Sequence, residues 1–289
     1  MAKLKYFIQF LVIVFLFFIY RIIGLKFSSV LSGYIMMLLG PLFRSKNISD
    51  KNLKNALPNS TYNERKKILK LMWFNYGQIL SEYMFIKDFR KSKRFSKKIS
   101  IENQEVLEKI KLEKNPVIFV SGHFNNFELM AMHIEKSGID LAAIYRPLNN
   151  VFLNPIMEQI RKKYICKKQI KKGISGTKLL LKHFKEKTSI ALMIDQRVSE
   201  GIKSNFFNKE AYTTTIPAQF IKKFNIKVVP IYIERLKNNT FKIKIYNPIT
   251  FKKDETINSI TLHLNSILEG MIMKNPEQWI WTHNRWKIK

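Results

Sequence analysis

A histidine and a glutamate five positions apart are the residues of this sequence best suited to chemistry. They are His123 and Glu128, in the stretch FVSGHFNNFE (119–128). A glutamate that accepts a hydrogen bond from one imidazole nitrogen fixes the tautomer, and the other nitrogen can then remove a proton from a hydroxyl group. The alternative is that both residues only cap a strand-to-helix turn, and their spacing alone does not decide between these two interpretations.

Geometry limits where such a pair can lie. On one continuous helix, residues five apart point about 140° away from each other. Contact therefore requires His123 in a turn and Glu128 at the start of the next helix. The apolar run PVIFV (116–120) predicts a buried strand, Gly122 permits a turn, and 126–137 predicts a helix. If the acceptor hydroxyl itself attacks, no protein nucleophile is needed, and the chemistry would be direct acyl or phosphoryl transfer to an alcohol.

The elements around this turn predict an α/β fold, with a largely parallel mixed sheet flanked by helices. Buried strands are expected at 116–120, 141–145, 189–194 and 228–234, and the helices between them at 126–137, 151–164, 175–186 and 215–224. The alternating stretch 240–246 predicts an antiparallel strand near the sheet edge, and a last helix is expected at about 256–273. Thr61 and Glu64 have the spacing of a capping box that starts an amphipathic helix.

Composition narrows the class of partner. The 289 residues include 51 Lys and Arg against 21 Asp and Glu, a formal charge of +30. This charge favours nucleic acid, acidic proteins, anionic membranes or phosphorylated lipids as partners. The single cysteine, Cys166, excludes an internal disulfide and a cysteine-cluster metal site, and no histidine pair has zinc-helix spacing. No metal is therefore expected, and we also expect no cofactor.

The N-terminus predicts a membrane anchor. Residues Tyr6 to Leu25 are almost entirely apolar, and about 20 such residues suffice for a helix to cross the hydrocarbon core. A cleaved signal peptide is the rival interpretation, but no small-residue cleavage site follows Leu25. The excess of basic residues after the apolar run places the body in the cytoplasm by the positive-inside rule. Val30 to Phe43 is expected to be an interfacial or re-entrant packing segment and not a second span, which gives an anchor region at 1–45 and an α/β domain at 46–289.

Several stretches in order make a family resemblance specific. SGHFNNFE resembles the first motif of the lysophospholipid-acyltransferase superfamily, and within it the lipid A biosynthesis lauroyl/myristoyl acyltransferases. The further stretches that resemble this branch are NLKNALPN (52–59), YRPLNN (145–150), DQRVSEGIKSNFF (195–207), AYTTTIPAQFIKKF (211–224), VVPIYIER (228–235) and PEQWIWTHNRWK (276–287). The usual first motif of the family has glycine at the position of Asn125 and tryptophan at that of Phe127, and Asn208 also stands where glycine is frequent.

The resemblance implies a single-pass enzyme of the bacterial inner membrane, with its catalytic domain on the cytoplasmic side. It would move a fatty acyl chain from acyl carrier protein (ACP), as acyl-ACP, to a hydroxyl of a Kdo-bearing lipid A precursor. By the motif match, His123 would be the general base and Glu128 its partner. Arg146 and Arg161 would bind acceptor phosphates or the transition-state charge, and Asp195 and Gln196 would shape the site.

Two other functions stay open at this stage. The same chemistry could serve another membrane acceptor, such as a lysophospholipid, glycerol phosphate or glycolipid. However, the usual phospholipid branch ends its first motif in Asp and lacks a tail like WIWTHNRW. A membrane-tethered nucleic-acid-binding protein would explain the charge but not the ordered motifs, so no nucleic acid partner is expected. The aromatic tail from Trp279 to Trp286 fits either a membrane interface or an extended segment packed on the core.

Overall fold

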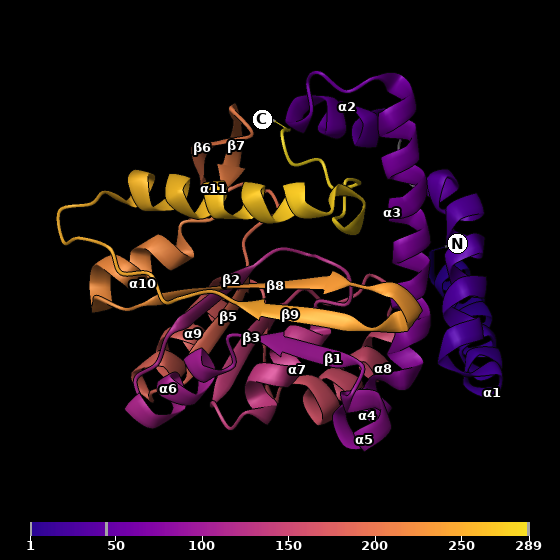
Figure 1. The fold of residues 1–289 in the computed structure, drawn as a ribbon, viewed down its shortest axis with the longest axis horizontal. Helices are drawn as coiled ribbons and strands as arrows, with labels where there is room; N and C mark the ends of the chain where they lie inside the picture. The colour runs from indigo at the N-terminus through magenta and orange to yellow at the C-terminus, as the bar shows by residue number, and fades with distance from the viewer. Residues whose placement is uncertain (1, 44–45, 288–289) are drawn as a thin grey trace.

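A mixed, largely parallel sheet forms the centre of the protein (Figure 1). The computed structural model describes residues 2–43 and 46–287. In these residues the sheet has seven strands, in the order β1 (Ile99–Glu102), β9 (Phe241–Ile245), β8 (Val228–Arg235), β2 (Ile118–Ser121), β5 (Ser189–Met193), β3 (Leu141–Tyr145) and β4 (Lys168–Lys171). Only the β8–β9 pair is antiparallel among the paired strands of this sheet. The expected fold class is confirmed, as is the antiparallel strand at 240–246.

Helices cover both faces of the sheet. Those before the first strand are α1 (Ala2–Phe43), α2 (Lys46–Ala56), α3 (Tyr62–Glu82), η1 (Tyr83–Phe85), α4 (Ile86–Lys91) and α5 (Lys93–Ser96). The later ones are α6 (Glu105–Glu113), α7 (Glu128–Lys136), α8 (Leu153–Ile160), the π-helix η2 (Arg161–Ile165), α9 (Ile174–Lys185), α10 (Ile216–Phe224), η3 (Lys237–Asn239), α11 (Ile257–Lys274) and η4 (Pro276–Gln278). Figure 1 shows α6 and α7 on one side of the sheet, and α11 on the other with the hairpin β6 (Ile202–Phe206) and β7 (Lys209–Thr213). On α9, Phe184 packs against Phe220 and Phe224 of α10.

The central strands are apolar because both of their faces are covered. Every residue of β2 is buried, and so are the first six residues of β8, from Val228 to Ile233. Continuous apolar runs of this kind are typical of parallel strands between two helical layers. The chain therefore brings the carboxyl ends of β2 and its parallel neighbour β5 to one edge of the sheet, where Ser121 pairs with Met193.

The two long N-terminal helices pack tightly against each other. Gly24 has φ of 77° and divides α1 into two helical halves. The second half, which contains the expected interfacial segment, runs beside α3: Ser32 Oγ donates a hydrogen bond of 2.6 Å to the Gly77 carbonyl. A Cβ at Gly77 would lie only 2.1 Å from the Ser32 carbonyl oxygen, so this crossing requires glycine. At the start of α3, Thr61 and Glu64 form the expected capping box.

Some elements were not predicted. Strands β1 and β4 are short and partly exposed, and the hairpin β6–β7 lies outside the main sheet. None of them has the long apolar run that identified the central strands. The predicted domain boundary between residues 45 and 46 remains a prediction, because residues 44 and 45 lie outside the described part of the chain.

Candidate active site

The turn after β2 presents His123 at the carboxyl edge of the sheet. As expected, His123 lies in the turn, and Glu128 is the first residue of α7. Gly122 allows the chain to pass close to its neighbours, because a Cβ there would lie 3.0 Å from the Phe124 ring and 3.2 Å from Asp195 Cβ. In open α/β sheets this edge is where ligands bind.

The partner of His123 is Asp195, and the expected contact with Glu128 is wrong. His123 Nδ1 lies 2.8 Å from Asp195 Oδ1, and the His123 backbone N–H donates to Asp195 Oδ2 at 2.9 Å. A carboxylate only accepts, so Nδ1 carries the proton and Nε2 is the basic nitrogen. Nε2 has no hydrogen-bond partner among the described residues, and 22% of the His123 side chain is exposed. Asp195 follows β5, which is why the parallel pairing of β2 and β5 brings the two side chains together.

Electrostatics favour the ionised form of both members of this pair. Burial opposes the charged form of His123, but the negative charge and hydrogen bond of Asp195 outweigh it and raise the pKa of His123 above its ordinary value. Burial likewise opposes the Asp195 carboxylate, yet the charge of His123 and its hydrogen bonds lower the pKa of Asp195 to about 2. Asp195 is therefore ionised at neutral pH and stabilises the imidazolium that forms when Nε2 takes a proton.

Glu128 instead forms an ion pair with Arg161. Glu128 Oε1 lies 2.7 Å from both Nε and Nη2 of Arg161 and accepts a hydrogen bond of 2.6 Å from the Tyr83 hydroxyl. Arg161 is only 9% exposed. Its guanidinium lies 5.7 Å from the centre of the Tyr145 ring, at the end of β3. The negative charge of Glu128 also contributes to the raised pKa of His123, so the carboxylate belongs to the site without touching the imidazole.

The remaining predicted site residues differ in their placement. Gln196 Nε2 lies 3.4 Å from His123 Nδ1 and so belongs to the same cluster. Arg146 is exposed in the loop that follows β3. The structure therefore brings together five of the six predicted residues, namely His123, Glu128, Arg161, Asp195 and Gln196. Tyr83 was missed because nothing in the sequence relates the end of α3 to the turn after β2.

The C-terminal segment completes the site, and sequence reasoning did not find this role. The Trp279 indole N–H donates to Asp195 Oδ2 at 2.8 Å, and both side chains are buried. Trp279 also forms a β-bridge with Phe124. The tail is thus packed on the core, as one of its two interpretations required. The burial of Trp281 and Trp286 agrees with this placement.

Hydrogen bonds from the same segment hold the turn after His123. Gln278 O accepts the Asn125 N–H at 3.0 Å, and its side-chain amide bonds the Asn125 amide and both backbone groups of Arg235. Below the turn, Asn126 donates to Glu82 at 3.0 Å, and Glu82 forms a buried ion pair with Arg235. These hydrogen bonds hold the turn in place after His123, although the side-chain oxygens of Asn125 and Asn126 are buried without a hydrogen-bond partner among the described residues.

The departures from the usual family motif have a conformational explanation. Asn125 has φ of 41° and Asn208 has φ of 56°, both in the left-handed region that glycine adopts most easily. Among residues with a Cβ, asparagine is one of the most tolerant of this region. Phe127 packs edge-on against the His123 ring, with centroids 4.9 Å apart. An aromatic contact with the histidine is therefore present where the family usually has tryptophan.

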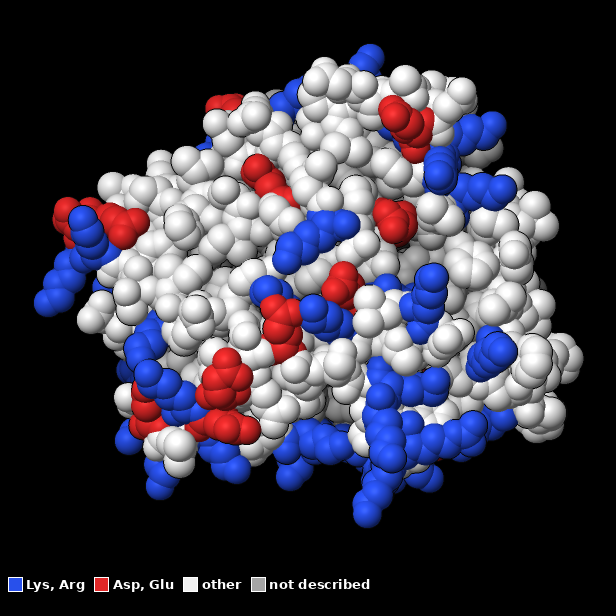
Figure 2. Space-filling model, viewed as in Figure 1, with Lys and Arg blue, Asp and Glu red and all other residues white. Residues whose placement is uncertain are grey.

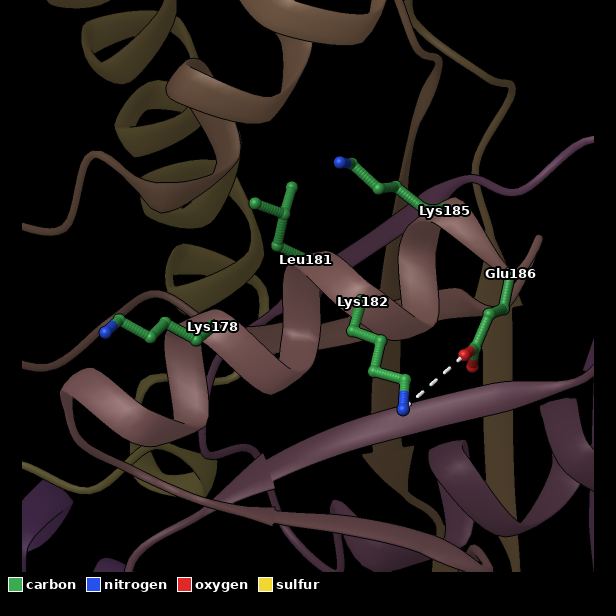
Figure 3. A pocket seen from close by; sticks show the side chains of 5 residues that line it. All are labelled: Lys178, Leu181, Lys182, Lys185 and Glu186. Carbon is green, nitrogen blue, oxygen red and sulfur yellow. Dashed lines mark ion pairs between the residues drawn. The ribbon is translucent and has the colours of Figure 1, made fainter.

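Other features of the described residues do not join this site. No cluster of three or more His, Cys, Asp or Glu side chains in the described ranges could hold a metal ion. A surface hollow on α9 is lined by Lys178, Leu181, Lys182, Lys185 and Glu186 (Figure 3). It contains none of the residues around His123.

A carboxylate-oriented histidine at the carboxyl edge of an α/β sheet is an arrangement that can activate a hydroxyl group. Comparison with known proteins is more specific. The family described as bacterial lipid A biosynthesis acyltransferase matches residues 1–288, and the chain belongs to that family. The protein is therefore an acyltransferase, and its family implies a lipid acceptor and membrane association.

Curated relatives agree over most of the chain. A lipid A biosynthesis acyltransferase of Haemophilus influenzae is 26% identical, over 84% of this chain and 77% of that protein. Two proteins of Escherichia coli K12 are similar at lower identity. Its lipid A biosynthesis palmitoleoyltransferase is 23% identical over 86% of this chain and 80% of its own length. Its lipid A biosynthesis lauroyltransferase is 22% identical over 85% and 80% respectively.

Proposed function

We propose that this protein transfers a fatty acyl chain from acyl-ACP to a hydroxyl group of a Kdo-bearing lipid A precursor at the bacterial inner membrane. The observation that carries the proposal is the His123–Asp195 pair, which leaves Nε2 open, in a chain that matches the family over residues 1–288. The high positive charge supports an acidic carrier protein as donor and a phosphorylated lipid as acceptor.

The reaction follows from the open nitrogen. Nε2 of His123 removes the proton from the acceptor hydroxyl, and the oxygen attacks the thioester carbonyl carbon. The resulting tetrahedral oxyanion collapses as the carbon–sulfur bond breaks, and the carrier thiolate takes the proton from the imidazolium. An ester and a free thiol result. Asp195 keeps the proton on Nδ1 throughout and stabilises the imidazolium between the two proton transfers.

Two arginines have different proposed roles. Arg161 is buried and fixed by Glu128, so it is a positioned cation for the negative charge that develops on the thioester oxygen. The Glu128 carboxylate balances the buried positive charge of Arg161 and sets the orientation of its guanidinium. Arg146 is exposed beyond β3, where an acceptor phosphate can reach it.

The test is a transfer assay with purified protein in detergent. Labelled acyl-ACP or acyl-coenzyme A is offered with a panel of acceptors that includes the Kdo-bearing precursor, lysophosphatidic acid and a glycolipid. We expect transfer from acyl-ACP to the precursor, a loss of at least 10²-fold in kcat for His123→Ala, and no loss for His183→Ala. His183 is a suitable control because it pairs with Glu186 on α9, away from the site.

The outcomes separate the parts of the proposal. Undiminished turnover by His123→Ala would overturn the mechanism. Transfer only to lysophosphatidic acid or the glycolipid would leave the mechanism intact and overturn the acceptor, and transfer only from acyl-coenzyme A would overturn the donor.

A further inference from the structure

The first half of α1 lies lengthwise on the α/β domain. Its less exposed side chains follow one helical stripe, which includes Gln9, Ile13, Phe17 and Tyr20. This spacing of three and four residues is that of a single helix face. Phe17 and Tyr20 are buried. The stripe therefore faces the protein, with burial at Phe17 and Tyr20 and partial cover at Gln9 and Ile13.

Contacts with the domain exist at both ends of this half. Near the N-terminus, the Asn150 side chain donates a hydrogen bond of 2.8 Å to the Tyr6 carbonyl. The Phe152 ring packs between Phe7 and Phe10, at centroid distances of 5.4 and 6.0 Å. Near Gly24, Arg21 forms an ion pair with Asp88 of α4. Tyr6 and Arg21 are about 22 Å apart along a helix that rises 1.5 Å per residue.

The opposite face of the helix is apolar and exposed. Leu4, Leu11, Phe15, Phe18 and Ile22 are 50–68% exposed. The neighbouring loop and the start of α8 add Leu148, Val151, Phe152 and Ile156, which are 36–56% exposed and which we call the α8 rim. Figure 2 shows that the side of the molecule where α1 lies carries few charged side chains, whereas lysines and arginines gather along the lower edge.

These contacts conflict with a helix that crosses the bilayer. A crossing helix that kept the Tyr6 contact would draw Asn150 and its surroundings roughly 22 Å into a hydrocarbon core of about 30 Å. The exposed residues beside Asn150 include Asn149 and Arg146, and polar groups at that depth are strongly unfavourable. An in-plane helix meets no such cost, because its polar surroundings stay at the headgroup level.

We propose that α1 lies along the membrane surface, with its outer face and the α8 rim immersed in the lipid of one leaflet and the N-terminus on the same side as the α/β domain. Interfacial helices usually carry their own polar face. In this protein the α/β domain replaces that polar face, because it covers the inner stripe of α1. The apolar rim next to α1 continues the lipid-facing surface toward the loop that carries Arg146.

Cysteine accessibility tests this arrangement without reference to catalysis. In a Cys166→Ser background, Lys3→Cys reports on the N-terminus and Lys185→Cys, on the exposed side of α9, reports on the domain (Figure 3). A membrane-impermeant maleimide is applied to spheroplasts and to inverted membrane vesicles. We expect both positions to react in the same preparation. Reaction of Lys3→Cys in spheroplasts and of Lys185→Cys only in inverted vesicles would overturn the proposal.

Depth measurements provide a second, independent readout. Fluorophores are attached at Leu4→Cys, Phe15→Cys and Val151→Cys of the full chain in vesicles of phosphatidylethanolamine and phosphatidylglycerol. Lipids with a nitroxide near the headgroup or near the chain end are the quenchers. An in-plane helix predicts stronger quenching of all three positions by the shallow nitroxide. Strongest quenching of Phe15→Cys by the deep nitroxide, with no quenching at Val151→Cys, would contradict it.

Discussion

The two ends of the chain are both rich in apolar and aromatic residues, yet the fold uses them in opposite ways. The C-terminal segment from Asn275 to Trp286 is packed into the core, and each indole N–H there has an acceptor: Asp195 for Trp279, the Pro276 carbonyl for Trp281 and the Phe206 carbonyl for Trp286. The first half of α1 instead exposes one whole apolar face. Apolar content alone therefore does not distinguish a core segment from a lipid-facing one.

The pairing of polar groups makes the difference. A tryptophan can be buried without cost to its N–H only where an acceptor is fixed in place, and the tail supplies three such matches. The outer face of α1 has no polar groups to match, so it gains nothing specific from a protein partner and suits lipid equally well. The following predictions test this contrast, beginning with the largest expected effect.

Replacing Asp195, whose carboxylate accepts the hydrogen bond from Trp279, should lower turnover most. Asp195→Asn removes the carboxylate that raises the pKa of His123, so kcat should fall on the order of 10³- to 10⁴-fold. In the proposed mechanism His123 acts in its neutral form, so activity should decline as the pH falls through the pKa of that residue. Loss of Asp195 lowers this pKa, so the acid limb of kcat/KM should move to lower pH.

The matched control is Asp140→Asn, which makes the same change at a partly exposed ion pair with Lys168. Its turnover and pH profile should be unchanged. An acid limb that stays in place in Asp195→Asn would contradict the assignment of Asp195 as the partner of His123.

Removing the Trp279 N–H that donates to Asp195 should lower kcat less, and it should shift the pH profile in the opposite direction. The Trp279 hydrogen bond contributes to the low pKa of Asp195. Trp279→Phe keeps an aromatic ring but removes the donor, so the carboxylate interacts more strongly with His123. We expect kcat to fall about 10-fold, in line with one lost hydrogen bond to a charged group, and the acid limb to move to higher pH.

Trp281→Phe distinguishes positioning from packing. It removes an equivalent indole donor whose acceptor is the Pro276 carbonyl, and both tryptophans are buried. Both variants should lose about 0.5–1.5 kcal/mol of unfolding free energy. A pH profile shifted equally in both would show that Trp279 acts only through stability.

At the other end of the chain, the contact between α1 and α3 should matter for stability but not for lipid binding. Gly77→Ala places a Cβ 2.1 Å from the Ser32 carbonyl oxygen. Overpacking of this kind costs about 1–3 kcal/mol. Denaturant titration in detergent should detect this loss, while flotation with vesicles stays unchanged because the outer face of α1 is intact.

Gly270→Ala in α11 is the control, since a Cβ there meets no atom within 4 Å. It should leave stability unchanged or raise it by up to about 1 kcal/mol, because alanine favours helix more than glycine does. Loss of vesicle binding in Gly77→Ala would show that lipid binding depends on the α1–α3 contact.

The smallest effect concerns the hairpin that covers the tail. Phe207 and Asn208 both have positive φ in the turn between β6 and β7, and Phe207 packs on Trp286. Asn208→Gly should change the unfolding free energy by less than about 1 kcal/mol, whereas Asn208→Val should cost about 1–2 kcal/mol. Equal denaturation midpoints for the two variants would argue against a conformational role for Asn208.

The sequence predicted the helices and strands themselves better than it predicted which of them lie side by side. The apolar runs located β2, β3, β5 and β8, and the capping-box spacing located the start of α3. Strand order is a property of long-range packing, and no local pattern reveals that β5 lies beside β2. For the same reason, Glu128 was the nearest available carboxylate in sequence, whereas Asp195, 72 residues from His123, is the nearest in space.

The placement of Trp279 and Gln278 has a consequence for biosynthesis. Chains emerge from the ribosome N-terminus first, so α1 is available to the membrane long before the segment that holds Asp195 and Asn125 has been made. A nascent chain can thus be attached to lipid while its histidine still lacks the support of the tail. The hydrogen bonds from Trp279 to Asp195 and from Asn125 to Gln278 can form only when synthesis is nearly complete.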